Sequence, residues 1–279
     1  MTQCPGATPY PIPPAVQEAY GPTDLSSMSL FGGGFINFGH WQDIDLGRPL
    51  TEDDRISSQQ AMYRHVLAAL APVEGPRVLE VGSGLGVGCA VALEEYGFAH
   101  VTGMDIHPQQ LKRAEQANAD LLARRAEQLR FAHGAAECMP FAEGTFDCLY
   151  SVEAAQHFRD LDAFAREAAR VLRPGGRAVI ASFFVPDSDP ARPERLAELL
   201  DTYSTGLDVA HTIPQLTGSL QRAGLTGVRA TAIGASVWPG WDCWLARMWE
   251  PGTWPRNFLR AYREGTLDYF TVTAQRSMP

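Results

Sequence analysis

Short apolar runs alternate with helical patterns along most of this chain. The runs are too short for helices and predict buried strands, whereas apolar positions three and four residues apart predict amphipathic helices. Strands that alternate with helices are typical of an α/β fold with a mostly parallel sheet. The strands are predicted near residues 78–81, 101–105, 146–152, 179–184, 228–237 and 269–275, and helices near 51–71, 87–96, 106–125, 160–172, 193–203 and 213–223.

A glycine-rich turn follows the first predicted strand. Gly82, Gly84 and Gly86 occupy alternate positions, and the helical pattern over residues 87–96 begins directly after them. Glycine allows the backbone to approach a ligand and to adopt a positive φ angle. The start of a helix presents free N–H groups to that ligand. Strand, turn and helix therefore predict the first half of a βαβ nucleotide-binding unit.

Two carboxylates indicate which ligand binds at this turn. The turn reads G-x-G-x-G instead of the G-x-G-x-x-G of dinucleotide sites, and Glu80 precedes its first glycine by two residues. A carboxylate there repels a pyrophosphate and attracts a cation, and S-adenosylmethionine (SAM) carries an ammonium and a sulfonium but no phosphate. Asp105 ends the second predicted strand, where a ribose diol is held in such folds. The pattern favours SAM over a dinucleotide.

The residues from Glu80 to Gly86, followed by Asp105, resemble the class I SAM-dependent methyltransferases. Three further motifs stand in the family's order: F-A-H-G-A-A-E-C-M-P-F at residues 131–141, the fourth strand with its end near Glu153, and R-V-L-R-P-G-G at 170–176. The resemblance covers roughly residues 60–275. It implies a Rossmann-like, seven-stranded, mostly parallel sheet with helices on both faces, an N-terminal lid and substrate-side insertions. It also implies methyl transfer from SAM, with S-adenosylhomocysteine as product and no metal.

The resemblance also implies which residues bind SAM. Asp105 and Gln110 match positions that hold the ribose, and residues 131–141 match the segment beside the adenine. Because Ala135 stands where many relatives have Asp, the adenine contact is expected from Glu137 or the backbone of Ala136. The expected cofactor-binding residues are Glu80, Gly82, Ser83, Gly84, Gly86, Asp105, Ile106, Gln110, Ala136, Glu137, Ser151 and Trp41.

Two histidines are candidate bases. His157 lies four residues past Glu153, just beyond the fourth strand, where ligands bind in open α/β sheets. With a usual pKa near ~6.5, an imidazole accepts a proton at neutral pH. His157 also matches the E-x-x-x-H segment of sugar and polyketide O-methyltransferases. Some of these pair the histidine with an acid at the end of strand five, but Ser182 stands there and such a pair is not expected. His40, where relatives often have Tyr, is the second candidate.

Two aromatic segments are candidates for the acceptor side. Residues 31–41 combine aromatic residues with glycine and predict an active-site cover, plain packing or an oligomer contact. Five of the six tryptophans fall in residues 238–254, as a small core, a subunit interface or a pocket for an apolar acceptor. We expect residues 1–50 to form an arm and cover and 51–279 the methyltransferase domain, with insertions at 188–212 and 238–265. The expected pocket residues are Phe35, Phe38, Phe183, Trp238 and Trp241.

The composition limits the kinds of partner that the protein is expected to bind. The net charge of −9 and the absence of a Lys/Arg cluster argue against nucleic acid as a substrate. No apolar run approaches the ~20 residues of a membrane span. The N-terminus does not resemble a signal peptide, and the five scattered cysteines show no zinc-binding spacing, so a reducing cytoplasm is the expected setting. A small-molecule acceptor is the expected partner.

Three functions agree with this pattern. The leading hypothesis is O-methylation of a small, rather apolar secondary metabolite, with a histidine base. The first alternative is methylation of an aromatic or alkene carbon, with or without coupled cyclisation. The second is a cyclase that retains SAM and moves no methyl group.

Overall fold

The computed structural model describes residues 10–70 and 75–278. It contains a seven-stranded sheet in the order β3-β2-β1-β4-β5-β7-β6. β7 runs antiparallel to both β5 and β6, and the other neighbouring pairs are parallel. The predicted sheet, seven-stranded and mostly parallel, is confirmed. The strands are β1 (Arg77–Val81), β2 (His100–Asp105), β3 (Leu129–His133), β4 (Phe146–Val152), β5 (Leu172–Phe184), β6 (Leu225–Ala232) and β7 (Asp268–Arg276).

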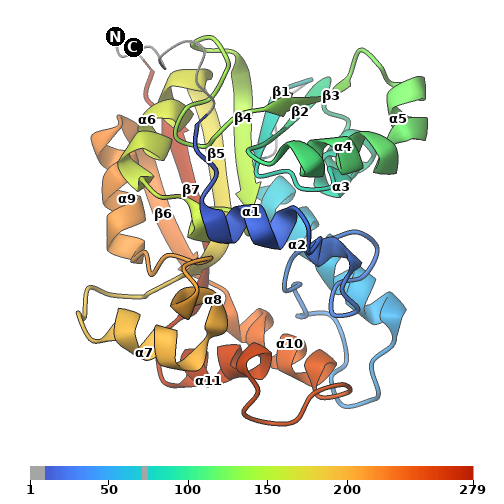
Figure 1. Ribbon diagram of the computed structural model, residues 1–279. Coiled ribbons are helices and arrows are strands. Elements are labelled where there is room, and N and C mark those ends of the chain that lie inside the picture. The colour runs from blue at the N-terminus through green and yellow to red at the C-terminus, as the bar shows by residue number, and fades with distance from the viewer. Residues whose placement is uncertain (1–9, 71–74, 279) are drawn as a thin grey trace.

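Helices cover both faces of the sheet (Figure 1). Successive residues of a strand point to opposite faces, so β1 contributes Val78 to one hydrophobic core and Leu79 to the other. The first core includes α2 and α3, and the second includes α6 and α9. The helices that flank the sheet are α2 (Glu52–Leu70), α3 (Val87–Tyr96), α4 (Pro108–Ala117), α5 (Ala119–Arg124), α6 (Leu161–Val171) and α9 (Ile213–Arg222).

The long helix predicted over residues 106–125 is two helices, α4 and α5. They meet at Asn118, whose side-chain amide donates to the carbonyls of Ala114 and Leu85. Asparagine competes in this way with helical backbone bonding. The bond to Leu85 ties this break to the glycine-rich turn.

Further helices gather at one end of the sheet (Figure 1). All but η3 come from the two predicted insertions, and the helix predicted over residues 193–203 is interrupted at Leu200. The elements are α7 (Arg192–Leu199), α8 (Asp201–Ser204), η3 (Gly234–Ser236), α10 (Trp238–Leu245), η4 (Trp254–Arg256) and α11 (Asn257–Arg263).

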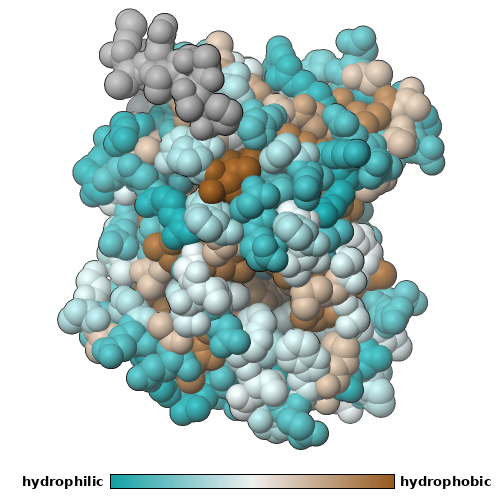
Figure 2. Space-filling model, viewed as in Figure 1, coloured by the Kyte–Doolittle hydropathy of each residue, from teal (hydrophilic) through white to brown (hydrophobic). Residues whose placement is uncertain are grey.

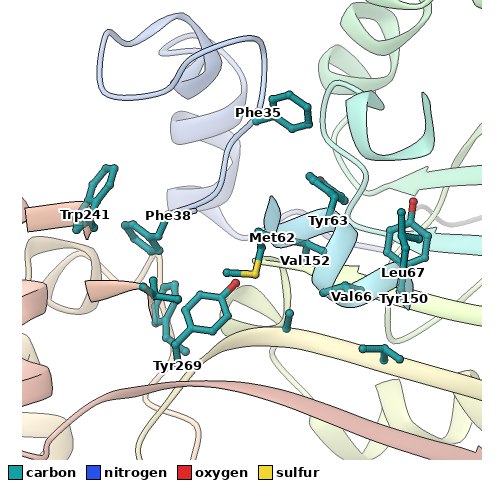
Figure 3. Close-up of a cluster of buried hydrophobic side chains, with 14 of the residues drawn as sticks. Phe35, Phe38, Met62, Tyr63, Val66, Leu67, Tyr150, Val152, Trp241 and Tyr269 are labelled. Atoms are coloured by element: carbon teal, nitrogen blue, oxygen red, sulfur yellow. The ribbon is translucent and has the colours of Figure 1, made fainter. Parts of the chain in front are cut away.

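The N-terminal part lies across the molecule between the sheet and these helices (Figure 1). It contains α1 (Pro14–Tyr20) and η1 (Leu25–Ser27), followed by the aromatic segment 31–41. Phe38 packs at 4.8 Å, ring centre to ring centre, against Trp241, and Phe35 lies beside Tyr63 (Figure 3). The two aromatic segments therefore form one buried cluster within the chain. None of the described helices is long and apolar enough to cross a membrane.

Candidate active site

A cavity of about 910 Å³, its open mouth included, lies at the carboxyl ends of β1, β2 and β4. Its floor is the glycine-rich turn, and α1 with Tyr20 covers it. Eight of the twelve expected cofactor residues line it, among them Asp105 and Gln110. The full group is Gly82, Ser83, Gly84, Asp105, Ile106, Gln110, Ala136 and Glu137.

The glycine-rich turn needs glycine for two physical reasons. Gly82 has a φ of +77°, a conformation that side chains disfavour, and a Cβ there would meet the Cβ of Ala154 at 2.3 Å. The turn is fixed to the neighbouring strand, because the N–H of Gly82 donates to the Met104 carbonyl. The backbone therefore lies against β4 and leaves the cavity open above it.

Asp105 is oriented by the backbone around it. Its Oδ2 accepts from the N–H of Gly84 at 2.9 Å, and its Oδ1 accepts from the N–H of His107 at 2.8 Å. Burial raises the pKa of this carboxyl. Each carboxylate oxygen keeps a further lone pair, and the side chain lines the cavity, which suits a ligand with a pair of hydroxyls.

Several buried polar atoms in this region have no hydrogen-bond partner among the described residues. Ser83 Oγ and Gln110 Nε2 belong to residues that line the cavity, and Glu80 Oε1 belongs to the strand that leads into it. The other Glu80 oxygen accepts from Tyr150 and from Cys89, and burial raises the Glu80 pKa to about 7. An unpaired buried polar group costs about 1–3 kcal/mol, and a ligand with ammonium and hydroxyl groups would remove that cost at Ser83 and Gln110, which line the cavity.

Four expected cofactor residues do not line the cavity. Glu80 lies behind its wall, fully buried, and Gly86 packs against the Phe131 ring. Ser151 donates its hydroxyl to the Val81 carbonyl, and Trp41 donates its indole N–H to the Phe38 carbonyl. These groups support the walls of the site.

A second cavity, of about 990 Å³ with its mouth, adjoins the first. Tyr20, Ile36, Glu153 and His157 line both. Figure 2, in the same view as Figure 1, shows the surface hollowed near its middle. No lysine or arginine is among the described residues that line this second cavity. Its apolar wall consists of Leu25, Met28, Leu30, Phe31, Ile36, Phe38, Phe183, Leu207, Trp241, Trp254, Pro255 and Phe258.

The structure places three of the five expected pocket residues in this wall: Phe38, Phe183 and Trp241. The other two lie behind it. Phe35 packs against Tyr63, and Trp238 is fully buried and stacks on Phe258 at 5.3 Å. The tryptophan-rich segment therefore supplies both a small core and one side of a pocket.

His157 is held where the two cavities meet. Its Nδ1 lies 3.0 Å from the Leu207 carbonyl oxygen and 3.1 Å from Asp208 Oδ1. Its Nε2 lies 2.8 Å from Tyr20 Oη. A carbonyl only accepts hydrogen bonds, so the neutral ring carries its proton on Nδ1 and leaves a lone pair on Nε2. This is the tautomer that a base requires.

Asp208 and Tyr20 are the two partners that the sequence did not reveal. No acid pairs with His157 from the end of strand five, where Ser182 stands, but the insertion before α9 supplies one that the sequence analysis missed, Asp208. Ser182 holds Gln156 in place by a 2.6 Å hydrogen bond. The pattern S-V-E-A-A-Q-H carries no signal for a partner about fifty residues away.

His40, the second candidate base, lies elsewhere. Its ring stacks on His65 with the ring centres 4.9 Å apart, and it is not among the residues that line either cavity. Burial and the neighbouring His65 lower its pKa. The hydroxyl that faces His157 belongs to Tyr20 instead.

Known proteins resemble this chain in sequence. A family model described as a methyltransferase domain matches residues 79–180. The 2-methyl-6-phytyl-1,4-hydroquinone methyltransferase of Synechocystis is 31% identical over 96% of this chain and 84% of its own length. The chain belongs to the class I SAM-dependent methyltransferases. The erythromycin 3''-O-methyltransferase of Saccharopolyspora erythraea is another relative of this methyltransferase, 30% identical over 77% of this chain and 70% of its own length.

Solved structures share the fold of the methyltransferase at lower identity. Geranyl diphosphate C-methyltransferase from Streptomyces coelicolor superposes with a TM-score of 0.74 at 17% identity, over 86% of this chain and 91% of that one. The [4+2]-cyclase SpnF superposes with a TM-score of 0.64 at 18% identity, over 88% of this chain and 89% of that one. These likenesses concern the fold and carry no conclusion about the acceptor.

Proposed function

We propose that this methyltransferase transfers the methyl group of SAM to a hydroxyl oxygen of a small, largely apolar acceptor, with His157 as the base. The placement of His157 carries the proposal. The ring lines both cavities, its Nδ1 faces a carbonyl and a carboxylate, and its Nε2 has a lone pair.

The first cavity fits SAM because its unpaired polar atoms suit the cofactor's charges and hydroxyls. Asp105 and Gln110 would hold the ribose, and Ala136 and Glu137 would border the adenine. Ser83 and the glycine-rich turn would receive the amino-acid end. When bound, SAM supplies a methyl group activated by its sulfonium, and S-adenosylhomocysteine is the product.

The side chains of the methyltransferase then have two tasks. The apolar wall of the second cavity orients the acceptor and excludes water, which accounts for much of the rate of a two-substrate reaction. The acceptor hydroxyl takes the place of Tyr20 Oη beside His157 and gives its proton to Nε2. The Asp208 carboxylate, 3.1 Å from Nδ1, stabilises the imidazolium that forms.

The lining of the second cavity limits the acceptor. Twelve of its residues are apolar, and its acidic groups are the carboxyls of Glu153, Asp201 and Asp208. A phosphate or carboxylate on the acceptor would face these acids without a cation to pair with. We therefore infer an acceptor without an anionic group.

The test measures transfer of the labelled methyl group from SAM to uncharged phenols and alicyclic alcohols. In His157→Ala, kcat should fall about 10²–10⁴-fold, the usual contribution of a general base, whereas the Kd of S-adenosylhomocysteine by calorimetry should change less than twofold. Glu95→Gln, a surface change at a carboxylate paired with Arg64, is the control. Turnover by His157→Ala at the wild-type rate would contradict the proposal.

A second candidate is methylation of a ring carbon. The relative from Synechocystis, which matches 96% of this chain, is named for a hydroquinone, and the second cavity is rich in aromatic residues. Here His157 would deprotonate a ring hydroxyl, and the neighbouring carbon would take the methyl group. The proton on that carbon would then leave, which restores the aromatic ring. Carbon NMR of the product distinguishes a methoxyl from a methyl on the ring.

A further inference from the structure

Glu153 adopts a backbone conformation that its side chain disfavours. It follows β4 directly and has a φ of +48°, and Asp24 is the one other non-glycine residue with positive φ in the described part of the chain. Such a conformation is unfavourable for a residue with a long side chain. The cost is offset only if contacts elsewhere hold the carboxyl in place.

Two donors hold one oxygen of this carboxyl. Oε1 accepts from the backbone N–H of Phe38 at 2.7 Å and from Tyr269 Oη at 3.0 Å. The nearby Arg55 guanidinium donates to the carbonyls of Leu30, Asn37 and Phe38 and does not bond to the acid. Oε2 has no partner among the described residues, although the side chain lines both cavities. The geometry therefore fixes the carboxyl and leaves its second oxygen for a ligand.

This carboxyl and the proposed base belong to one turn. The side-chain N–H₂ of Gln156 donates to the Glu153 carbonyl at 2.8 Å and lies 3.2 Å from His157 Nε2. Both side chains border the junction of the two cavities. Two groups that exchange protons or hydrogen bonds thus stand together where the methyl group is transferred.

The charge state of Glu153 favours a hydroxyl as its ligand. Burial raises the pKa of this carboxyl to about 8, so both the protonated and the ionised form exist near neutral pH. The protonated form donates a hydrogen bond and the ionised form accepts one. A hydroxyl does both, whereas an ammonium only donates and a ketone only accepts.

We propose that Glu153 binds a second hydroxyl of the acceptor, adjacent to the one that is methylated, so that the acceptor is an ortho-dihydroxy ring or a vicinal diol. This inference rests on the proposed function. One hydroxyl lies at His157 Nε2, and its neighbour pairs with Glu153 Oε2. An acceptor with an isolated hydroxyl leaves Oε2 unpaired in the closed site. Glu153 is thus a residue that positions the acceptor and selects it.

The experiment compares two probes of similar size and apolar area, 2,3-dihydroxynaphthalene and 2-naphthol. Their binding to the full-length protein saturated with S-adenosylhomocysteine is measured by calorimetry. The wild type should bind the diol about tenfold more tightly. Glu153→Met, which keeps the volume and removes both oxygens, should bind the two probes within twofold. Glu153→Gln, which can still donate one hydrogen bond, should retain part of the preference, and the surface variant Glu95→Gln all of it.

The outcomes separate this inference from the proposed function. Equal affinity of the wild type for the two probes, or binding of neither, overturns the role of Glu153, even if Glu153→Met does not fold. A preference that survives in Glu153→Met overturns it too. His157→Ala should lose turnover, whereas the surface variant Glu95→Gln should keep both turnover and the preference for the diol. If no hydroxyl is methylated while the preference still depends on Glu153, the proposed function fails and the diol subsite stands.

Discussion

The two cavities share four residues, yet they are built in different ways. The floor of the cofactor cavity is formed by one strand end, the glycine-rich turn and the carboxylate of the next strand, all between residues 81 and 105. The acceptor cavity takes its shape from side chains on four separate stretches, around residues 20–38, 153–157, 201–208 and 241–258, and from Phe183 of β5. The cofactor cavity needs particular residues at fixed spacing. The acceptor cavity needs only side chains of suitable size and polarity at its lining positions.

This difference determines which residues tolerate substitution. A side chain added at Gly82 meets the Cβ of Ala154, whose position the backbone fixes. A larger or smaller side chain in the aromatic wall changes the volume of the acceptor cavity and leaves the fold in place. We expect changes on the cofactor side to act on every acceptor alike, and changes on the acceptor side to act on one acceptor more than another. Four predictions test this contrast between the cofactor cavity and the acceptor cavity, from the largest expected effect to the smallest.

Gly82→Ala should abolish binding of S-adenosylhomocysteine, with at least a 100-fold rise in Kd by calorimetry. The added Cβ meets Ala154 at 2.3 Å, which costs about 1–3 kcal/mol in overpacking, and the φ of +77° adds about 1 kcal/mol. Gly97→Ala is the matched control, because its φ is +64° but a Cβ there meets nothing within 4 Å. Wild-type affinity in Gly82→Ala would remove the distinction between the two cavities.

Glu80→Gln should change how the stability of the ligand-free protein depends on pH. Burial raises the Glu80 pKa in the folded state from 4.5 to about 7, so the folded state favours the protonated form. Its contribution to stability is complete below about pH 4.5 and is lost as the pH rises through 7. A glutamine does not titrate.

The free energy of unfolding, measured in urea at pH 4.5 and pH 8, should therefore favour the variant over the wild type by about 3 kcal/mol more at pH 8. Glu95→Gln, at a surface carboxylate, should show no such gain. A wild-type-to-variant difference that is the same at both pH values would mean that folding does not raise the pKa of Glu80.

Asp208→Asn should lower kcat about 10–100-fold and leave the Kd of S-adenosylhomocysteine within twofold. The amide keeps the size of the carboxylate but does not stabilise the charged imidazole of His157, 3.1 Å away. Glu198→Gln, exposed on the same insertion, is the control and should keep wild-type kcat. An unchanged kcat in Asp208→Asn would show that the Leu207 carbonyl alone orients the ring.

His40→Gln should change kcat and the affinity for S-adenosylhomocysteine less than twofold. The ring stacks on His65 and lines neither cavity, so it has no route to the acceptor. Steady-state kinetics with an acceptor identified by label transfer checks this. A tenfold loss of kcat would place His40 in the site after all.

The sequence predicts the cofactor side well because a positive φ and a close approach leave few residue types to choose from. Gly82, Gly84 and Asp105 are recognisable from spacing alone, since neighbouring strands in the sheet bring them together. The same local rule fails at Asn118, where one side-chain contact to Leu85 ends a helix that the periodicity extends.

The acceptor side is less predictable because its contacts join distant parts of the chain. Tyr20, Asp208 and His157 meet only once the N-terminal arm and the insertion have packed around the end of the sheet. Aromatic residues are visible in the sequence, but whether a ring faces a cavity or a core depends on packing, as Phe38 and Phe35 show. His40 was a reasonable candidate for the same reason and lies elsewhere.

The shared border of the two cavities also has a use in inhibitor design. Tyr20, Ile36, Glu153 and His157 border both spaces, so a single compound with an adenosyl head and an aromatic tail that displaces Tyr20 would reach from one to the other. Joining two weak binders in this way removes most of the entropic cost of the second association. Such a bisubstrate compound would also report, by the tail it prefers, the shape of the natural acceptor.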